Sequence, residues 1–154
     1  MPVAVSNLQR KVRVSPERLR VVVRRALAAL GRADRDVHVT VVDDRRIRAL
    51  NARYLGARRA TDVLAFDLAG PGPARLWGEI IVSAETAARQ ARRLRVPLAS
   101  ELDLLVVHGL LHLAGYDDDH PRQARRMHER ARAILAARSP RSVPARLWAG
   151  LLES

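Results

Sequence analysis

The stretch from residue 100 to residue 114 places the strongest constraint on how this chain can fold. From residue 104 onward it is apolar apart from two histidines, and a helix that is apolar on nearly all sides belongs in the middle of a domain. His108 and His112 stand four residues apart within it, so both rings project from one face of the helix. Imidazoles in an apolar neighbourhood need polar partners, which makes this pair the first candidate for a functional site.

The remaining patterns predict strands first and helices later along the chain. A run of β-branched residues predicts a strand at residues 37–42, and a second strand pair is predicted at residues 63–68 and 76–82, with short edge segments at 3–5 and 12–14. Helices are predicted at residues 15–30, 44–53, 83–94, 100–114 and 121–138. Gly70, Pro71, Gly72 and Pro73 predict a turn that joins the last two strands antiparallel. This order favours an α+β fold, in which helices pack on one side of a small mixed sheet of about four strands.

The length of 154 residues suits a single domain. We expect that domain to span residues 1–138, and we expect residues 139–154 to form a C-terminal extension whose apolar cluster packs on it. No apolar run approaches the ~18 residues that cross a bilayer, and the first residues lack the apolar core of a signal peptide. The sequence therefore predicts a cytoplasmic protein without a membrane partner.

The formal net charge is +12, and Lys11 is the single lysine among the basic residues. Such an excess of arginine favours a polyanionic partner, and nucleic acid is the natural one. A bias toward GC-rich codons is an alternative source of the same arginines. Only 3% of the residues are aromatic, so stacking of bases on aromatic rings is excluded as the main mode of binding.

The chain has no cysteine, so a metal ion has to be held by histidine and carboxylate. Gly115 is suited to end the helix that carries His108 and His112, and the returning chain can bring Asp118 to the same ion. Three protein ligands would leave one position open for water, as in catalytic zinc sites. Zinc suits these donors, and manganese and iron remain alternatives. The competing interpretation is a pair of core histidines followed by acidic residues that cap the next helix.

Four sequence elements resemble those of the YbeY endoribonuclease family. HGLLHLAGYD, beginning at His108, resembles the family signature H-G-x-L-H-L-x-G-Y-D-H. The other matching stretches are Asn51-Ala-Arg-Tyr54, Thr61-Asp62-Val63-Leu64-Ala65-Phe66 and Gly78-Glu79-Ile80. They follow the family's order and spacing across roughly residues 37–130.

The resemblance implies a zincin-like central helix that carries the metal ligands, with one Zn²⁺ per chain. Asp118 takes the place of the family's third histidine, and His120 is the alternative ligand two residues later. Leu55 replaces the family arginine, so Arg58 and Arg59 in the adjoining segment become the candidates for contact with substrate phosphate. No catalytic side chain is assigned.

The function implied by the resemblance is a metal-dependent, single-strand-specific endoribonuclease. It would act in small-subunit rRNA 3′ maturation and ribosome quality control, with ribosomal RNA and the ribosome as partners and without DNA. One alternative is a non-catalytic RNA-binding ribosome-assembly factor with a structural metal. Another is a zincin-type metallopeptidase, which Gly109 disfavours because those proteases carry a glutamate there as general base.

Overall fold

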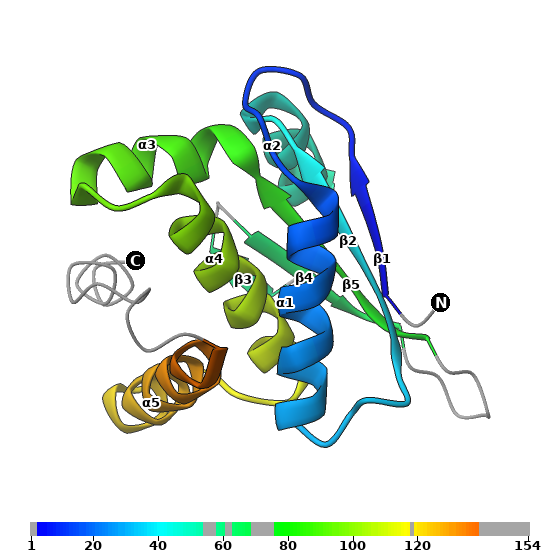
Figure 1. The fold of residues 1–154 in the computed structure, drawn as a ribbon, viewed down its shortest axis with the longest axis vertical. Coiled ribbons are helices and arrows are strands. Elements are labelled where there is room, and N and C mark those ends of the chain that lie inside the picture. Colours follow the sequence, from blue (N-terminus) through cyan, green and yellow to red (C-terminus); the bar gives the residue numbers. More distant parts are fainter. Residues whose placement is uncertain (1–2, 54–57, 61–62, 69–75, 118, 139–154) are drawn as a thin grey trace.

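The computed structural model describes residues 3–53, 58–60, 63–68, 76–117 and 119–138, and Figure 1 shows their arrangement. Strands and helices alternate up to residue 53, three consecutive strands follow between residues 58 and 83, and the remaining described elements are helices. The described elements are β1 (Val3–Asn7), α1 (Pro16–Ala29), β2 (Asp36–Val42), α2 (Asp44–Arg53), β3 (Arg58–Ala60), β4 (Val63–Asp67), β5 (Leu76–Ser83), α3 (Ala84–Leu94), α4 (Leu98–Leu113) and α5 (Pro121–Arg138).

One mixed sheet contains these strands in the order β1-β2-β5-β4-β3. β1, β2 and β5 run parallel, while β4 is antiparallel to β5 and β3 is antiparallel to β4. The predicted antiparallel connection between β4 and β5 is therefore confirmed. The prediction of about four strands missed β3, a three-residue strand at the sheet edge.

Most helices cover one face of the sheet. α1, α4 and α5 lie on this face (Figure 1), and their buried side chains form the main core with residues of β2, β4 and β5. α2 instead lies on the opposite face, where Ile47 packs with Val42, Leu64 and Ile81 in a second, smaller core. The α+β class is confirmed, but the expectation that all helices share one side was wrong for α2. Among the described residues, no helix is long and apolar enough to cross a membrane.

Most predicted helix boundaries agree with the structure to within two residues. The hydroxyl of Ser15 accepts a hydrogen bond from the backbone N–H of Arg18, and Pro16 occupies the first turn, so α1 begins where the sequence predicts it. α4 begins at Leu98, two residues before its predicted start. The predicted strand segment at residues 12–14 was wrong, because these residues belong to the loop that leads into α1.

α4 is the central helix, as its all-round apolar sequence predicts. Two glycines let it approach the sheet closely. A Cβ atom on Gly109 would lie 2.9 Å from Cγ2 of Ile80 on β5, and one on Gly78 of β5 would lie 2.8 Å from Cδ1 of Leu113. The close contact between α4 and β5 fixes the height at which His108 and His112 stand above the sheet.

Candidate metal centre

His108 and His112 converge at the C-terminal end of α4. Their Nε2 atoms lie 2.9 Å apart, and their ring centroids are 4.6 Å apart with the planes tilted by 54°. His108 is 6% exposed and His112 is half-buried, so the pair opens toward solvent on the side of His112. The spacing of four residues thus places both rings on one face, as the sequence predicts.

This geometry fits a shared metal ion. Two imidazole nitrogens that bind one zinc at about 2.0–2.1 Å with a tetrahedral angle lie roughly 3.3 Å apart, within a few tenths of an ångström of the 2.9 Å seen here. A hydrogen bond between one protonated and one unprotonated nitrogen has the same geometry. Metal binding requires both Nε2 atoms to be unprotonated, and it replaces the hydrogen bond with two coordinate bonds.

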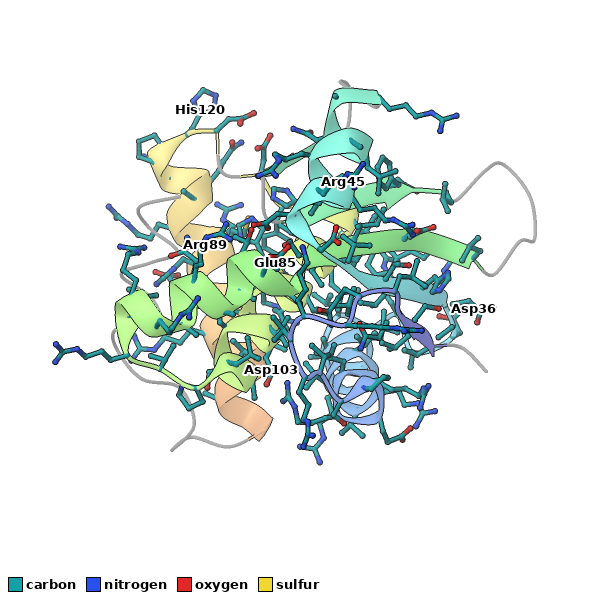
Figure 2. The ribbon with its side chains drawn as sticks, turned by 90° about the horizontal axis from the view of Figure 1, so that it is seen from above. Asp36, Arg45, Glu85, Arg89, Asp103 and His120 are labelled. Atoms are coloured by element: carbon teal, nitrogen blue, oxygen red, sulfur yellow. The ribbon has the colours of Figure 1, made fainter. Side chains whose placement is uncertain are left out.

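Among the described residues, no third potential ligand joins the histidine pair. Asp118, the sequence-predicted ligand, lies outside them. Within the described ranges, no three His, Cys, Asp or Glu side chains converge on one point. His120, the alternative, is exposed and points away from the body of the protein in Figure 2, directly before the first residue of α5. The described geometry therefore does not bring His120 to the histidine pair.

The chain turns sharply just after His112. Gly115 adopts φ +98°, a left-handed conformation that favours glycine, and its N–H donates to the carbonyl of His112 at 3.1 Å. The N–H of Tyr116 donates to the carbonyl of Leu111 at 3.0 Å. A cavity of about 280 Å³ opens beside this turn and is lined by Ala114, Gly115, Tyr116, Asp117, Gln123 and Arg126. The predicted helix stop is confirmed, and a polar cavity opens at this turn, whose first lining residue, Ala114, follows His112 by two positions.

The other sequence-predicted site residues belong to the sheet edge. Arg58 and Arg59 lie on β3, where they pair in register with Ala65 and Leu64 of β4. β4 also packs against α4, so the backbone of β3 lies one strand away from the helix that carries the histidines. Their role in substrate binding stays a prediction, as does the likeness of α4 to the zincin helix. Leu55 lies outside the described residues.

A polar cluster that the sequence did not reveal joins α2 to α3. Oδ1 of Asp44 accepts hydrogen bonds from the hydroxyls of Ser83 and Thr86, each at 2.5 Å, and Oδ2 accepts one from Arg89 at 2.5 Å. Burial raises the pKa of Asp44, but the hydrogen bonds from Ser83, Thr86 and Arg89 and the charge of Arg89 outweigh it and lower the pKa to about 2. No local sequence pattern reveals this cluster, because the hydroxyl partners of Asp44 lie about forty residues away along the chain.

Comparisons with known proteins agree with the fold and the signature. A Thermotoga maritima protein of known solution structure has the same fold, with a TM-score of 0.57 and 23% identity over 91% of this chain and 94% of its own. An endoribonuclease YbeY of Anaeromyxobacter sp. is 48% identical over 82% of this chain and 67% of its own length. One from Geobacter metallireducens is 41% identical over 88% and 95%. The family model described as endoribonuclease YbeY matches residues 4–139. The chain belongs to the YbeY endoribonuclease family.

Proposed function

We propose that this chain is a cytoplasmic, metal-dependent endoribonuclease that cuts single-stranded RNA during small-subunit rRNA 3′ maturation and ribosome quality control. Membership of the YbeY family supports RNA hydrolysis. The observation that carries the metal dependence is the convergence of the His108 and His112 Nε2 atoms to 2.9 Å at the solvent-facing end of α4. We propose Asp118 as the third ligand and Zn²⁺ as the ion, one per chain.

The bound ion would supply an activated water and polarise the scissile phosphodiester. The chain's own residues hold and orient it. α4 fixes both imidazoles against the sheet through the contact of Gly109 with Ile80, and the turn at Gly115 ends the helical path shortly after His112. We propose that Arg58 and Arg59 contact the phosphates of the RNA, because a planar guanidinium pairs with two phosphate oxygens at once.

The cavity beside the turn suits a role next to the scissile bond. Tyr116, Asp117, Gln123 and Arg126 give it an aromatic ring, hydrogen-bonding groups of both kinds and a positive charge. Position 109 offers no general base of the peptidase kind, because glycine has no side chain and a Cβ there would meet Ile80. The absence of this base disfavours a peptidase.

A cleavage assay on a labelled single-stranded RNA tests this function. We expect cutting by the purified protein, loss of cutting after chelation and its return on addition of Zn²⁺. His112→Ala is purified in parallel, and it should be inactive if no contaminating ribonuclease is present. A metal-loaded, folded protein that binds the RNA without cutting it would favour the non-catalytic assembly factor.

A further inference from the structure

A second surface, remote from the histidine pair, has the properties of an RNA-binding groove. It is a cavity of about 700 Å³ between α3 and the loop that leads into α1, within the roughly 300–1,000 Å³ typical of ligand pockets. Small and apolar side chains and five charged ones line it: Val12, Ala88, Ala91, Val96, Leu98, Lys11, Glu85, Arg89, Arg92 and Arg95. Figure 2 shows Glu85 and Arg89 along α3, the helix that forms one wall.

The charges of this groove are unbalanced. Four basic side chains face it, against the single carboxylate of Glu85. Nζ of Lys11 lies 3.5 Å from Oε1 of Glu85, and Arg89 is paired with Asp44 from α2. Arg92 and Arg95 are both exposed on the same wall. The lining of the groove therefore carries more basic than acidic side chains, together with several apolar ones.

The groove is separate from the candidate metal centre. Leu98, at its edge, is the first residue of α4, and His108 and His112 follow ten and fourteen residues later. At about 1.5 Å per residue, the helix places the histidines roughly 15–20 Å from the groove. A ligand in the groove does not touch the metal-binding nitrogens, but a strand of several nucleotides can reach both places.

We propose that this groove binds the phosphate backbone of the RNA strand that is cut at the histidine pair, and so holds the strand at a second point. This proposal rests on the proposed endoribonuclease function. Three of the four cations are arginines, which pair with phosphate in two-pronged geometry. Ala88 and Ala91 on the floor are small, so the strand can approach α3 closely. An acidic protein segment is the competing occupant, and the test separates the two.

Lys11 offers a direct readout because it is the only lysine of the chain and its side chain is 61% exposed. Untagged protein is treated with an amine-acylating reagent, and the extent of Lys11 modification is measured by mass spectrometry. A single-stranded RNA of about twenty nucleotides should lower that modification severalfold, whereas polyglutamate at matched charge should not. Protection by polyglutamate alone, or by neither polymer, would overturn the proposal.

Arg92→Ala and Arg93→Ala form a matched pair for the same experiment. Both remove one arginine from the last turn of α3, but only Arg92 lines the groove, while Arg93 hydrogen-bonds to Gln90. Arg92→Ala should abolish the protection of Lys11 and reduce the slope of log affinity against log salt by about 0.7, the loss of one phosphate contact on a single strand. Arg93→Ala should leave both unchanged. Equal effects of the two variants would show general charge attraction and contradict a defined groove.

Chelated protein separates this proposal from the function on which it rests, because binding is then measured without cutting. Protection of Lys11 by RNA in a protein that never cuts RNA would support the binding groove and contradict the endoribonuclease function. If Arg92→Ala and the unaltered protein cut a twenty-nucleotide RNA with equal efficiency, the binding groove would be contradicted and the endoribonuclease function would stand. We expect Arg92→Ala to slow cutting of this RNA severalfold and to leave cutting of a five-nucleotide RNA unchanged.

Discussion

At the N-terminal end of α4, Asp103 is 5% exposed, and both of its carboxylate oxygens accept hydrogen bonds from Arg18 of α1, at 2.9 and 2.7 Å. At the C-terminal end, His108 and His112 face each other at 2.9 Å. Both ends bury ionisable groups in the same core. The Asp103 carboxylate forms an ion pair with an arginine from another helix, whereas the two imidazoles point at one shared position. The first arrangement stabilises the fold, and the second provides donors for a ligand.

Arg18→Leu tests the structural end of α4. Removing one partner of a buried ion pair typically costs about 3–5 kcal/mol, and because Arg18 is partly exposed we expect about 2–4 kcal/mol from the free energy of unfolding. Urea unfolding measures this loss. Metal content per folded chain should stay unchanged, because Asp103 stands five residues before His108 and so faces α1 from a different side of the helix.

Arg20→Leu is the matched control, since Arg20 stands on the same helix and pairs with the exposed Glu17. Loss of this surface pair should cost less than about 1 kcal/mol. Equal losses of stability for Arg18→Leu and Arg20→Leu would remove the distinction between a buried structural pair and a surface one.

Substitution of Asp118, the proposed third ligand, tests the C-terminal end of α4. Asp118→Ala should lower metal affinity by at least ~10-fold, because loss of even an outer partner of a ligand typically costs roughly 10–100-fold. Asp118→His should retain the metal, since it supplies an imidazole at the position of the family histidine. Competition with a zinc chelator of known affinity measures each value. Metal retained by Asp118→Ala and lost by His120→Ala would assign the third ligand to His120.

Sequence patterns captured those parts of the fold that depend on neighbouring residues. Ser15 and Pro16 mark the start of α1, and Gly115 marks the end of α4, because caps act through local backbone geometry. The short strand β3 carries no β-branched residue, and it exists only through its pairing with β4. The ion pair of Arg18 with Asp103 joins residues 85 positions apart, which no local pattern reveals.

The same division holds for the candidate site. The helical spacing of His108 and His112 predicted their convergence, because it depends on one helix alone. Asp118 is outside the described residues, and its role as a ligand stays a prediction, because sequence spacing does not fix the path of the chain beyond a helix end. The groove beside α3 depends on a loop and a helix about eighty residues apart in sequence, and only the fold brings Lys11 to Glu85.

The smallest expected effect on stability concerns Asp44. Its partly buried carboxylate accepts hydrogen bonds from two hydroxyls as well as from an arginine. Its pKa of about 2 lies below the ordinary value of 3.8, so its stabilising contribution is complete above about pH 4 and is lost as the pH falls toward 2. Asp44→Asn should cost about 1–2 kcal/mol at pH 7 and flatten this acid-dependent loss. Urea unfolding between pH 2 and 7 measures both.

The control for this pH series is Asp34→Asn, which changes the net charge equally at an exposed position between α1 and β2. It should change the free energy of unfolding by no more than about 0.5 kcal/mol at pH 7. An unchanged pH profile in Asp44→Asn would mean that the cluster with Ser83 and Thr86 does not stabilise the fold.

The central claim is that the C-terminal end of α4 is a metal centre, and elemental analysis of purified protein tests it most directly. We predict about one divalent transition metal per chain in the unaltered protein and almost none in the double variant His108→Ala, His112→Ala, with circular dichroism showing that the variant remains folded. His38→Ala is the matched control, because His38 bonds to Ser6 across the first two strands, and it should retain the metal. Full metal occupancy in the folded double variant would contradict the account.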